Sequence, residues 1–231
     1  MTRTGQLALD LRRRTWGGAR KGAGRPKSSK DVPHVARPAV SRHHPIHVGL
    51  RVRKEVGRLR RGPIYRAIAA ALRHTLAEAG FRVVHTSIQH NHLHFLIEAD
   101  GTAAFRYGMR SLTITAALAI NRVMGRRGQV FEYRYSARPI TSPRQMRNAL
   151  AYVLNNWRRH QEHLRSPAAG RSRLDPYSTA IRFRGWKQPA QMNVAGDYEP
   201  LPAAEPETWL LRVGWRRHGA ISAYAVPGTA P

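Results

Sequence analysis

The chain has no cysteine, few acidic residues and no long apolar run. Without cysteine there are no disulfides and no thiolate metal ligands, and a reducing compartment is allowed. No apolar stretch approaches the roughly 20 residues that a membrane-spanning helix needs. Residues 1–11 also lack the apolar core of a signal peptide. We therefore expect no membrane partner.

What the chain has instead is positive charge. Its 231 residues include 40 Lys and Arg against 13 Asp and Glu, a formal net charge of +27. Such an excess causes self-repulsion in a folded chain, so it indicates a polyanionic partner and not a folding device. Because the positive residues run along most of the sequence, we expect a broad basic surface. The resulting expectation is a cytoplasmic, nucleoid-associated protein.

Composition divides the chain into three parts. Residues 1–42 are predicted to be a disordered basic arm, because their Gly-rich, charged sequence has no apolar periodicity. Residues 43–165 are predicted to form the folded domain, and residues 166–231 a Pro-, Trp- and Arg-rich C-terminal extension. Within the extension, residues 208–218 are either a small helix packed on the domain or an element that contacts nucleic acid through Trp and Arg.

The arm is a candidate for nucleic-acid binding. Its segment Gly24-Arg25-Pro26-Lys27 resembles the core of an AT-hook, in which an extended Arg-Pro stretch enters a narrow minor groove. The alternative is a solvated tail that touches phosphates anywhere. In either case the predicted contacts in the arm are Arg20, Lys21, Arg25 and Lys27.

Hydrophobic periodicity predicts a mixed α+β domain. Strands with alternating or continuous apolar residues are expected at 44–53, 81–88, 92–98 and 130–140. Helices are expected between Gly62 and Gly80, at 103–124, and from Pro143 to about Leu164. The first six elements follow the order of a ferredoxin-like βαββαβ core, a four-stranded antiparallel sheet with two helices on one face. The last helix is then expected to cover part of the open face.

A His-x-His pair lies in the third predicted strand, which reads Asn91-His92-Leu93-His94-Phe95. Since side chains alternate along a strand, His92 and His94 project from the same face, while Leu93 and Phe95 point to the core. Two imidazoles about 6–7 Å apart on one face can bind a divalent cation. By the same alternation the open face also carries His47 and Arg51.

Tyr152 is the second candidate. The last helix has an apolar stripe at helical spacing, and Tyr152 lies about 140° from its centre. The residue is either a surface tyrosine that covers apolar neighbours or a nucleophile that a nearby metal-polarised phosphate would make effective. Arg159 shares this side of the helix and would lower the pKa of the phenol. The members of the apolar stripe are Met146, Leu150, Val153, Leu154, Trp157 and Leu164.

Asn156 lies one helical turn after Tyr152, so its amide oxygen is the candidate for completing the metal site formed by His92 and His94. The sequence also leaves His47, His85 and Gln89 open as the third ligand.

Together these residues carry a family resemblance. The Asn91-His92-Leu93-His94 strand resembles the HUH motif, two histidines around one bulky apolar residue, and Tyr152 with Asn156 follows on a later helix. Over residues 44–165 the chain resembles the single-tyrosine HUH transposases of insertion-sequence type, and most of all the REP-associated tyrosine transposases.

The resemblance implies a function. A transposase of this kind is a single-strand DNA endonuclease and strand transferase that acts on hairpin-flanked DNA with Mg²⁺ or Mn²⁺. Tyr152 would form a 5′-phosphotyrosine, His92, His94 and a third ligand would hold the metal, and Arg51 and Arg159 would contact DNA. Single-stranded or hairpin DNA is the expected partner, and the choice between monomer and homodimer stays open.

Three other functions fit parts of the sequence. His90, His92 and His94 also match a histidine-triad nucleotide hydrolase, in which the central His attacks a phosphate. A domesticated, non-catalytic DNA-binding protein would keep the fold without the chemistry. A ferredoxin-like sheet can also stack RNA bases, although the central strand here offers His where such sheets expose aromatic residues.

Overall fold

Four antiparallel strands form the sheet at the centre of the structure, a computed structural model that describes residues 39–165 and 171–228. The sheet order is β2-β3-β1-β4, with β1 at Ile46–Arg51, β2 at Phe81–Ile88, β3 at His92–Ala99 and β4 at Ser136–Pro139. The central strands β1 and β3 therefore carry the candidate histidines His47, His92 and His94. Nearly all of the predicted basic arm, including its four predicted contacts, lies outside the described residues.

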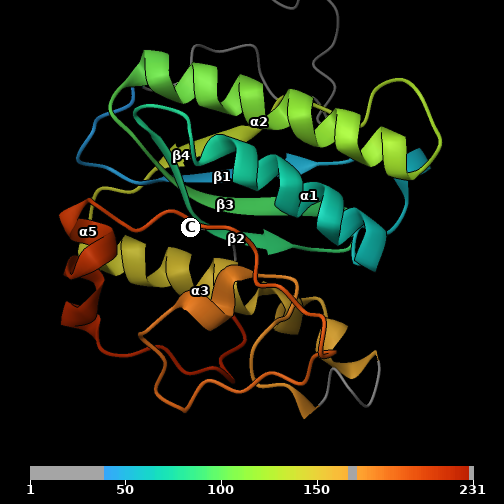
Figure 1. The fold of residues 1–231 in the computed structure, drawn as a ribbon. Coiled ribbons are helices and arrows are strands. Elements are labelled where there is room, and N and C mark those ends of the chain that lie inside the picture. Colours follow the sequence, from blue (N-terminus) through green and yellow to red (C-terminus); the bar gives the residue numbers. More distant parts are fainter. Residues whose placement is uncertain (1–38, 166–170, 229–231) are drawn as a thin grey trace, which may run out of the picture. The chain divides into compact units, whose positions relative to one another are not determined.

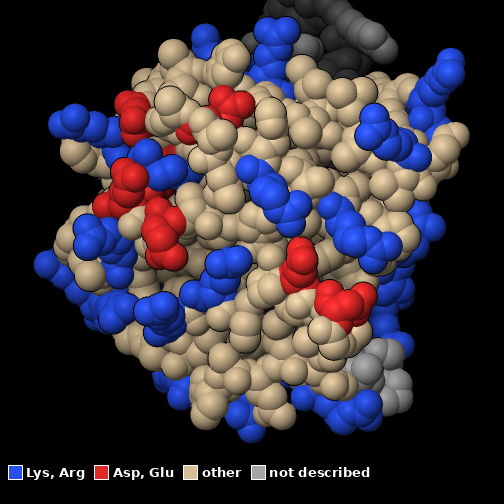
Figure 2. Space-filling model, viewed as in Figure 1, with Lys and Arg blue, Asp and Glu red and all other residues tan. Residues whose placement is uncertain are grey.

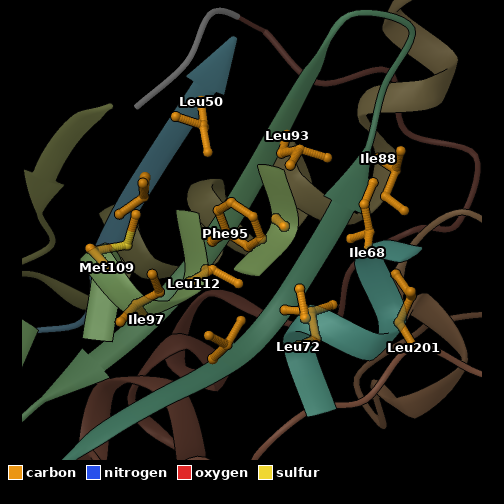
Figure 3. Close-up of a cluster of buried hydrophobic side chains, with 14 of the residues drawn as sticks. Leu50, Ile68, Leu72, Ile88, Leu93, Phe95, Ile97, Met109, Leu112 and Leu201 are labelled. Carbon is orange, nitrogen blue, oxygen red and sulfur yellow. The ribbon is translucent and has the colours of Figure 1, made fainter. Parts of the chain in front are cut away.

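Two helices cover one face of the sheet (Figure 1), α1 at Gly62–Thr75 and α2 at Thr102–Val123. Pro63 stands in the first turn of α1, where its missing N–H is not needed. The apolar residues of alternate strand positions pack against both helices, as Figure 3 shows for Leu93, Phe95 and Ile97 of β3. This main core confirms the predicted alternation of β1 and β3.

The third helix, α3 at Pro143–Arg159, packs on the opposite face of the sheet against β2 and β3 (Figure 1). Ser142 caps it by accepting a hydrogen bond from the N–H of Gln145. The prediction that the helix continues to Leu164 is wrong. Gln161 adopts a left-handed backbone conformation that ends the helical path, and Leu164 is exposed and does not belong to the buried stripe.

The predicted strand 130–140 is also too long, since only its last part, β4, pairs regularly with β1. Val52 and Phe131 form one isolated bridge before it. Gly125 and Gly128 have positive φ, so the chain turns twice between α2 and this bridge. The charged and aromatic residues between Phe131 and β4 lie in an irregular segment.

The C-terminal extension packs on α3 and along the free edge of β2. The N–H of Ile88 donates to the carbonyl of Tyr177, and the N–H of Ala204 donates to that of Val83. A short helix, α5 at Trp209–Arg212, and the following turn of 3₁₀ helix pack on α3. The extension therefore protects an otherwise open sheet edge and gives α3 a second apolar surface to contact.

Of the two interpretations of residues 208–218, the packed helix is confirmed. Trp215 is buried among α3 residues and donates its indole N–H to the carbonyl of Leu211. Trp209 is half exposed under the guanidinium of Arg217.

Among the described residues, no helix is both long and apolar enough to cross a membrane.

Candidate functional site

The two histidines of β3 lie on the sheet face that α3 covers, as strand alternation predicts. Their ring centroids are 4.7 Å apart. His47 joins them from β1, where it is two positions from Gly49, the residue paired with His94, and its Nε2 lies 3.2 Å from Nδ1 of His94. Three imidazoles from two adjacent strands therefore form one cluster.

Gly49 makes room for this cluster. It pairs with His94 in the sheet and with Ser136 on the other side. A Cβ at this position would stand 2.8 Å from the Ser136 hydroxyl and 3.8 Å from Nδ1 of His94. The glycine thus keeps the strip between β3 and β4 free of side chains beside the histidines.

Tyr152 of α3 lies directly over the cluster. Its ring makes edge contacts with His94 and His47, with centroid distances of 5.1 and 5.5 Å. The sequence interpretation of Tyr152 as a surface residue is wrong, because only 8% of the residue is exposed. The helix is covered by the sheet on one side and by the extension on the other, so a residue outside the main apolar stripe is buried as well.

His160 is a member of the cluster that sequence reasoning missed. Its ring lies 5.2 Å from that of His92, just after the end of α3. The signal was present in the spacing, since Tyr152, Asn156 and His160 follow one another at intervals of four and share one side of a helix.

Burial keeps the three sheet histidines neutral near pH 7. It lowers the pKa of His47 and of His92 to about 4, with smaller contributions from Arg138 at His47 and from His160 and Arg51 at His92. Burial also lowers the pKa of His94 well below its usual value. Neutral imidazoles keep a lone pair, which a metal ligand requires.

The surroundings of Tyr152 shift the pKa of its phenol in two opposing directions. Burial raises the pKa of the phenol above its usual value near 10. The positive charge of Arg159 and the neighbouring amide of Asn156 oppose this shift. The tyrosine is therefore protonated in the resting protein, with a cation at hand that favours the phenolate.

Several buried polar atoms at the cluster have no hydrogen-bond partner in the part of the chain that the structure describes. They include Nε2 of His94, both side-chain polar atoms of Asn156 and Oε1 of Gln89. In contrast, Nδ1 of His92 is 2.9 Å from Oδ1 of Asn91, so Nε2 is the nitrogen of His92 that could bind a metal. Imidazole nitrogens and an amide oxygen are donors that suit a divalent cation, so the residues present fit such a metal.

Many protein metal sites use three ligands from His, Cys, Asp or Glu. Here His92 and His94 supply only two of that kind. Across the described ranges, no group of three or more His, Cys, Asp or Glu side chains is arranged to hold a metal ion. A metal held by His92 and His94 would therefore also need an amide ligand, such as that of Asn156 or Gln89.

The remaining predicted residues lie at different distances from the cluster. His85 is on β2 and bonds to the hydroxyl of Thr179, so it is committed to the extension. Arg51 pairs with His92 across the sheet, is exposed, and forms an ion pair with Glu132. Arg159 is exposed at the end of α3 and donates to the backbone carbonyls of Pro227 and Gly228.

No protein-family model and no curated protein matches the chain. Among solved structures, the chain is similar to a REP-associated tyrosine transposase bound to a REP hairpin, with a TM-score of 0.53 and 16% sequence identity. The similarity covers 76% of this chain and 99% of the other. The two proteins thus share a fold at low sequence identity, and the shared part includes most of the chain.

Proposed function

We propose that the protein is a metal-dependent tyrosine transposase that cleaves and rejoins single-stranded DNA next to hairpins. The observation that carries this proposal is the position of the Tyr152 ring, 5.1 Å from His94, over a histidine pair on a sheet strand. The similarity in fold to a transposase bound to hairpin DNA supports the same reading. The sheet order β2-β3-β1-β4 is also the order of a ferredoxin-like core.

His92, His94 and Asn156 are the proposed metal ligands. The unpartnered Nε2 of His94 and Oδ1 of Asn156 support this assignment, with Gln89 as the alternative amide. Mg²⁺ or Mn²⁺ bound there would polarise the scissile phosphate. His47 would orient His94, because Nε2 of His47 can accept a hydrogen bond from Nδ1–H of His94. In that tautomer, Nε2 of His94 keeps its lone pair for the metal.

Tyr152 is the proposed nucleophile. Its phenol oxygen would form a bond to the phosphorus, the bond from phosphorus to the 3′ oxygen would break, and a 5′-phosphotyrosine and a free 3′-hydroxyl would result. The phenol loses its proton and the leaving oxygen gains one. Arg159 would stabilise the phenolate electrostatically. Because a phosphodiester is exchanged for another phosphoester, the reverse reaction can transfer the strand without external energy.

The test is a denaturing gel of purified protein with labelled single-stranded hairpin DNA from the region flanking its own gene, in the presence of Mn²⁺. We expect a covalent protein–DNA band that disappears with EDTA and in Tyr152→Phe. Tyr107→Phe is the matched control, because Tyr107 is an exposed tyrosine on the far face of α2 and should keep the band.

A band that persists in Tyr152→Phe would refute the assignment of the nucleophile. Tight hairpin binding without any band would instead favour a DNA-binding protein that has lost catalysis. A band lost in His90→Ala but kept in Tyr152→Phe would favour the histidine-triad reaction, although His90 lies outside β3 and is exposed.

A further inference from the structure

A cavity of about 560 Å³ lies between α1 and the C-terminal extension, and the proposed function does not use it. Tyrosines from three segments line it. Tyr65 of α1 contacts the ring of Tyr177 at 5.5 Å and that of Tyr198 at 6.0 Å between centroids. The volume is in the range of pockets that hold small ligands.

The tyrosines offer their rings, and not their hydroxyls, to a ligand in the cavity. The hydroxyl of Tyr65 donates to the carbonyl of Glu199, and that of Tyr198 donates to the carbonyl of Pro176. Since the polar ends are already occupied by backbone partners, what remains for a ligand is aromatic surface. Flat aromatic surface is what a nucleic-acid base stacks on.

A buried ion pair fixes one wall of the cavity. Arg60 makes two hydrogen bonds to the carboxylate of Asp175, at 2.7 and 3.0 Å, and lies 4.5 Å from the ring centre of Tyr177. The N–H of Tyr177 donates to the same carboxylate. This wall is therefore held in place without a ligand.

One end of the cavity is positive. It is lined by Gly62, in the first turn of α1, and by Arg66 one turn later. The side chain of Arg61, the residue before the helix, does not cap it, so the N–H groups of Gly62 and Ile64 are available to an anion, whereas Pro63 has none. The guanidinium of Arg66 lies close to Gly62, and among the described residues no carboxylate pairs with it. Figure 2 shows many basic side chains on the face that carries α1 and α2.

A buried hydrogen-bond donor lies in the wall of the cavity. Trp157 lines it and is fully buried, and its indole N–H has no partner among the described residues. A buried donor without a partner is costly unless a ligand or water accepts the bond.

We propose that this cavity binds one unstacked nucleotide of a single-stranded DNA. The base stacks on Tyr65 and Tyr198, and its phosphate binds Arg66 and the start of α1. This proposal rests on the proposed function for the identity of the polymer. Trp157 directly follows Asn156 in α3, so the nucleotide would be held beside the cleavage site and would help select which phosphate enters it.

The test measures equilibrium binding in the Tyr152→Phe background, so that cleavage does not contribute. Hairpin oligonucleotides are scanned with a single abasic position, and Tyr198→Ala and Arg66→Ala are compared with Tyr107→Ala and Arg110→Ala, exposed residues of α2. We expect one abasic position to weaken binding about tenfold or more. Tyr198→Ala should weaken binding to the intact oligonucleotide similarly and remove the effect of that abasic position.

Equal binding by the cavity variants and the α2 controls would overturn the proposal, as would an abasic effect of full size in Tyr198→Ala. These outcomes are independent of the proposed function. A covalent adduct with no contribution from the cavity would leave the transposase assignment intact. Cavity-dependent binding without an adduct would support the nucleotide site while the catalytic assignment failed.

Discussion

At the scale of the residue, the site depends on a few polar side chains held in buried positions. His92 and His94 share a sheet face because strand side chains alternate, and this could be predicted from the sequence. The neighbours of these histidines could not. His47 reaches His94 only through the pairing of β1 with β3, and His160 reaches His92 only because α3 crosses this face of the sheet.

His85 shows how burial of one residue affects stability. Burial lowers its pKa to about 4 from 6.5, so the unfolded chain binds a proton more readily than the folded one. The stabilisation that results is present above pH 6.5 and is lost as the pH falls towards 4. At pH 5 the lowered pKa of His85 should by itself reduce the free energy of unfolding by about 2 kcal/mol relative to neutral pH.

We therefore predict that the loss of stability between pH 7.5 and pH 5 is smaller in His85→Gln than in the native chain. Urea unfolding followed by tryptophan fluorescence at the two pH values measures it. His74→Gln, at an exposed position of α1, serves as the control and should keep the native pH dependence. An unchanged pH dependence in His85→Gln would contradict the assignment.

At the scale of the element, close packing decides which substitutions the helices tolerate. Gly108 of α2 lies against Phe81 at the start of β2, and a Cβ at this position would come within 2.1 Å of the ring. The contact brings the helix close to the sheet. Nothing in the local sequence of α2 requires a glycine there, so only the tertiary structure explains it.

Gly108→Ala is predicted to destabilise the protein by about 1–3 kcal/mol, because overpacking outweighs the roughly 1 kcal/mol gain in helix propensity. Chemical denaturation gives the difference directly. Ser111→Ala, one turn later and only partly buried, should be close to neutral. A more stable Gly108→Ala would show that α2 can move away from β2 at little cost.

The helix that carries Tyr152 shows the limit of periodicity at this scale. The apolar stripe of α3 is buried, apart from Leu164, and most of it packs in a cluster with residues of the sheet and of the extension. However, Tyr152 lies outside that stripe and is also buried, since it faces the histidines of the sheet. A hydrophobic pattern identifies the face with most apolar surface and cannot show that a second partner covers the rest.

At the scale of the whole molecule, the net charge of +27 governs the interaction with a polyanion. Binding that neutralises several phosphates releases counterions, so affinity falls steeply with salt. We predict that hairpin binding weakens about a hundredfold or more between 50 and 200 mM salt. Fluorescence anisotropy at several salt concentrations measures the slope.

A chain without residues 1–38 tests the predicted contribution of Arg20, Lys21, Arg25 and Lys27. Its salt dependence should be shallower but still present, because most of the basic residues lie in the rest of the chain. Binding that hardly changes with salt would indicate that the charge serves some other purpose. An unchanged slope after truncation would remove the arm from the interface.

The sequence by itself determined the order and approximate bounds of the main elements, the basic character of the protein and the two histidines on one strand face. These follow from local periodicity and composition, which need no partner segment. Only the tertiary structure decided that Tyr152 is buried over His94, that His47 and His160 join the cluster, and that the extension encloses α3 and forms the tyrosine-lined cavity. Those features depend on contacts between segments far apart in the chain, and no local pattern specifies which segments will meet.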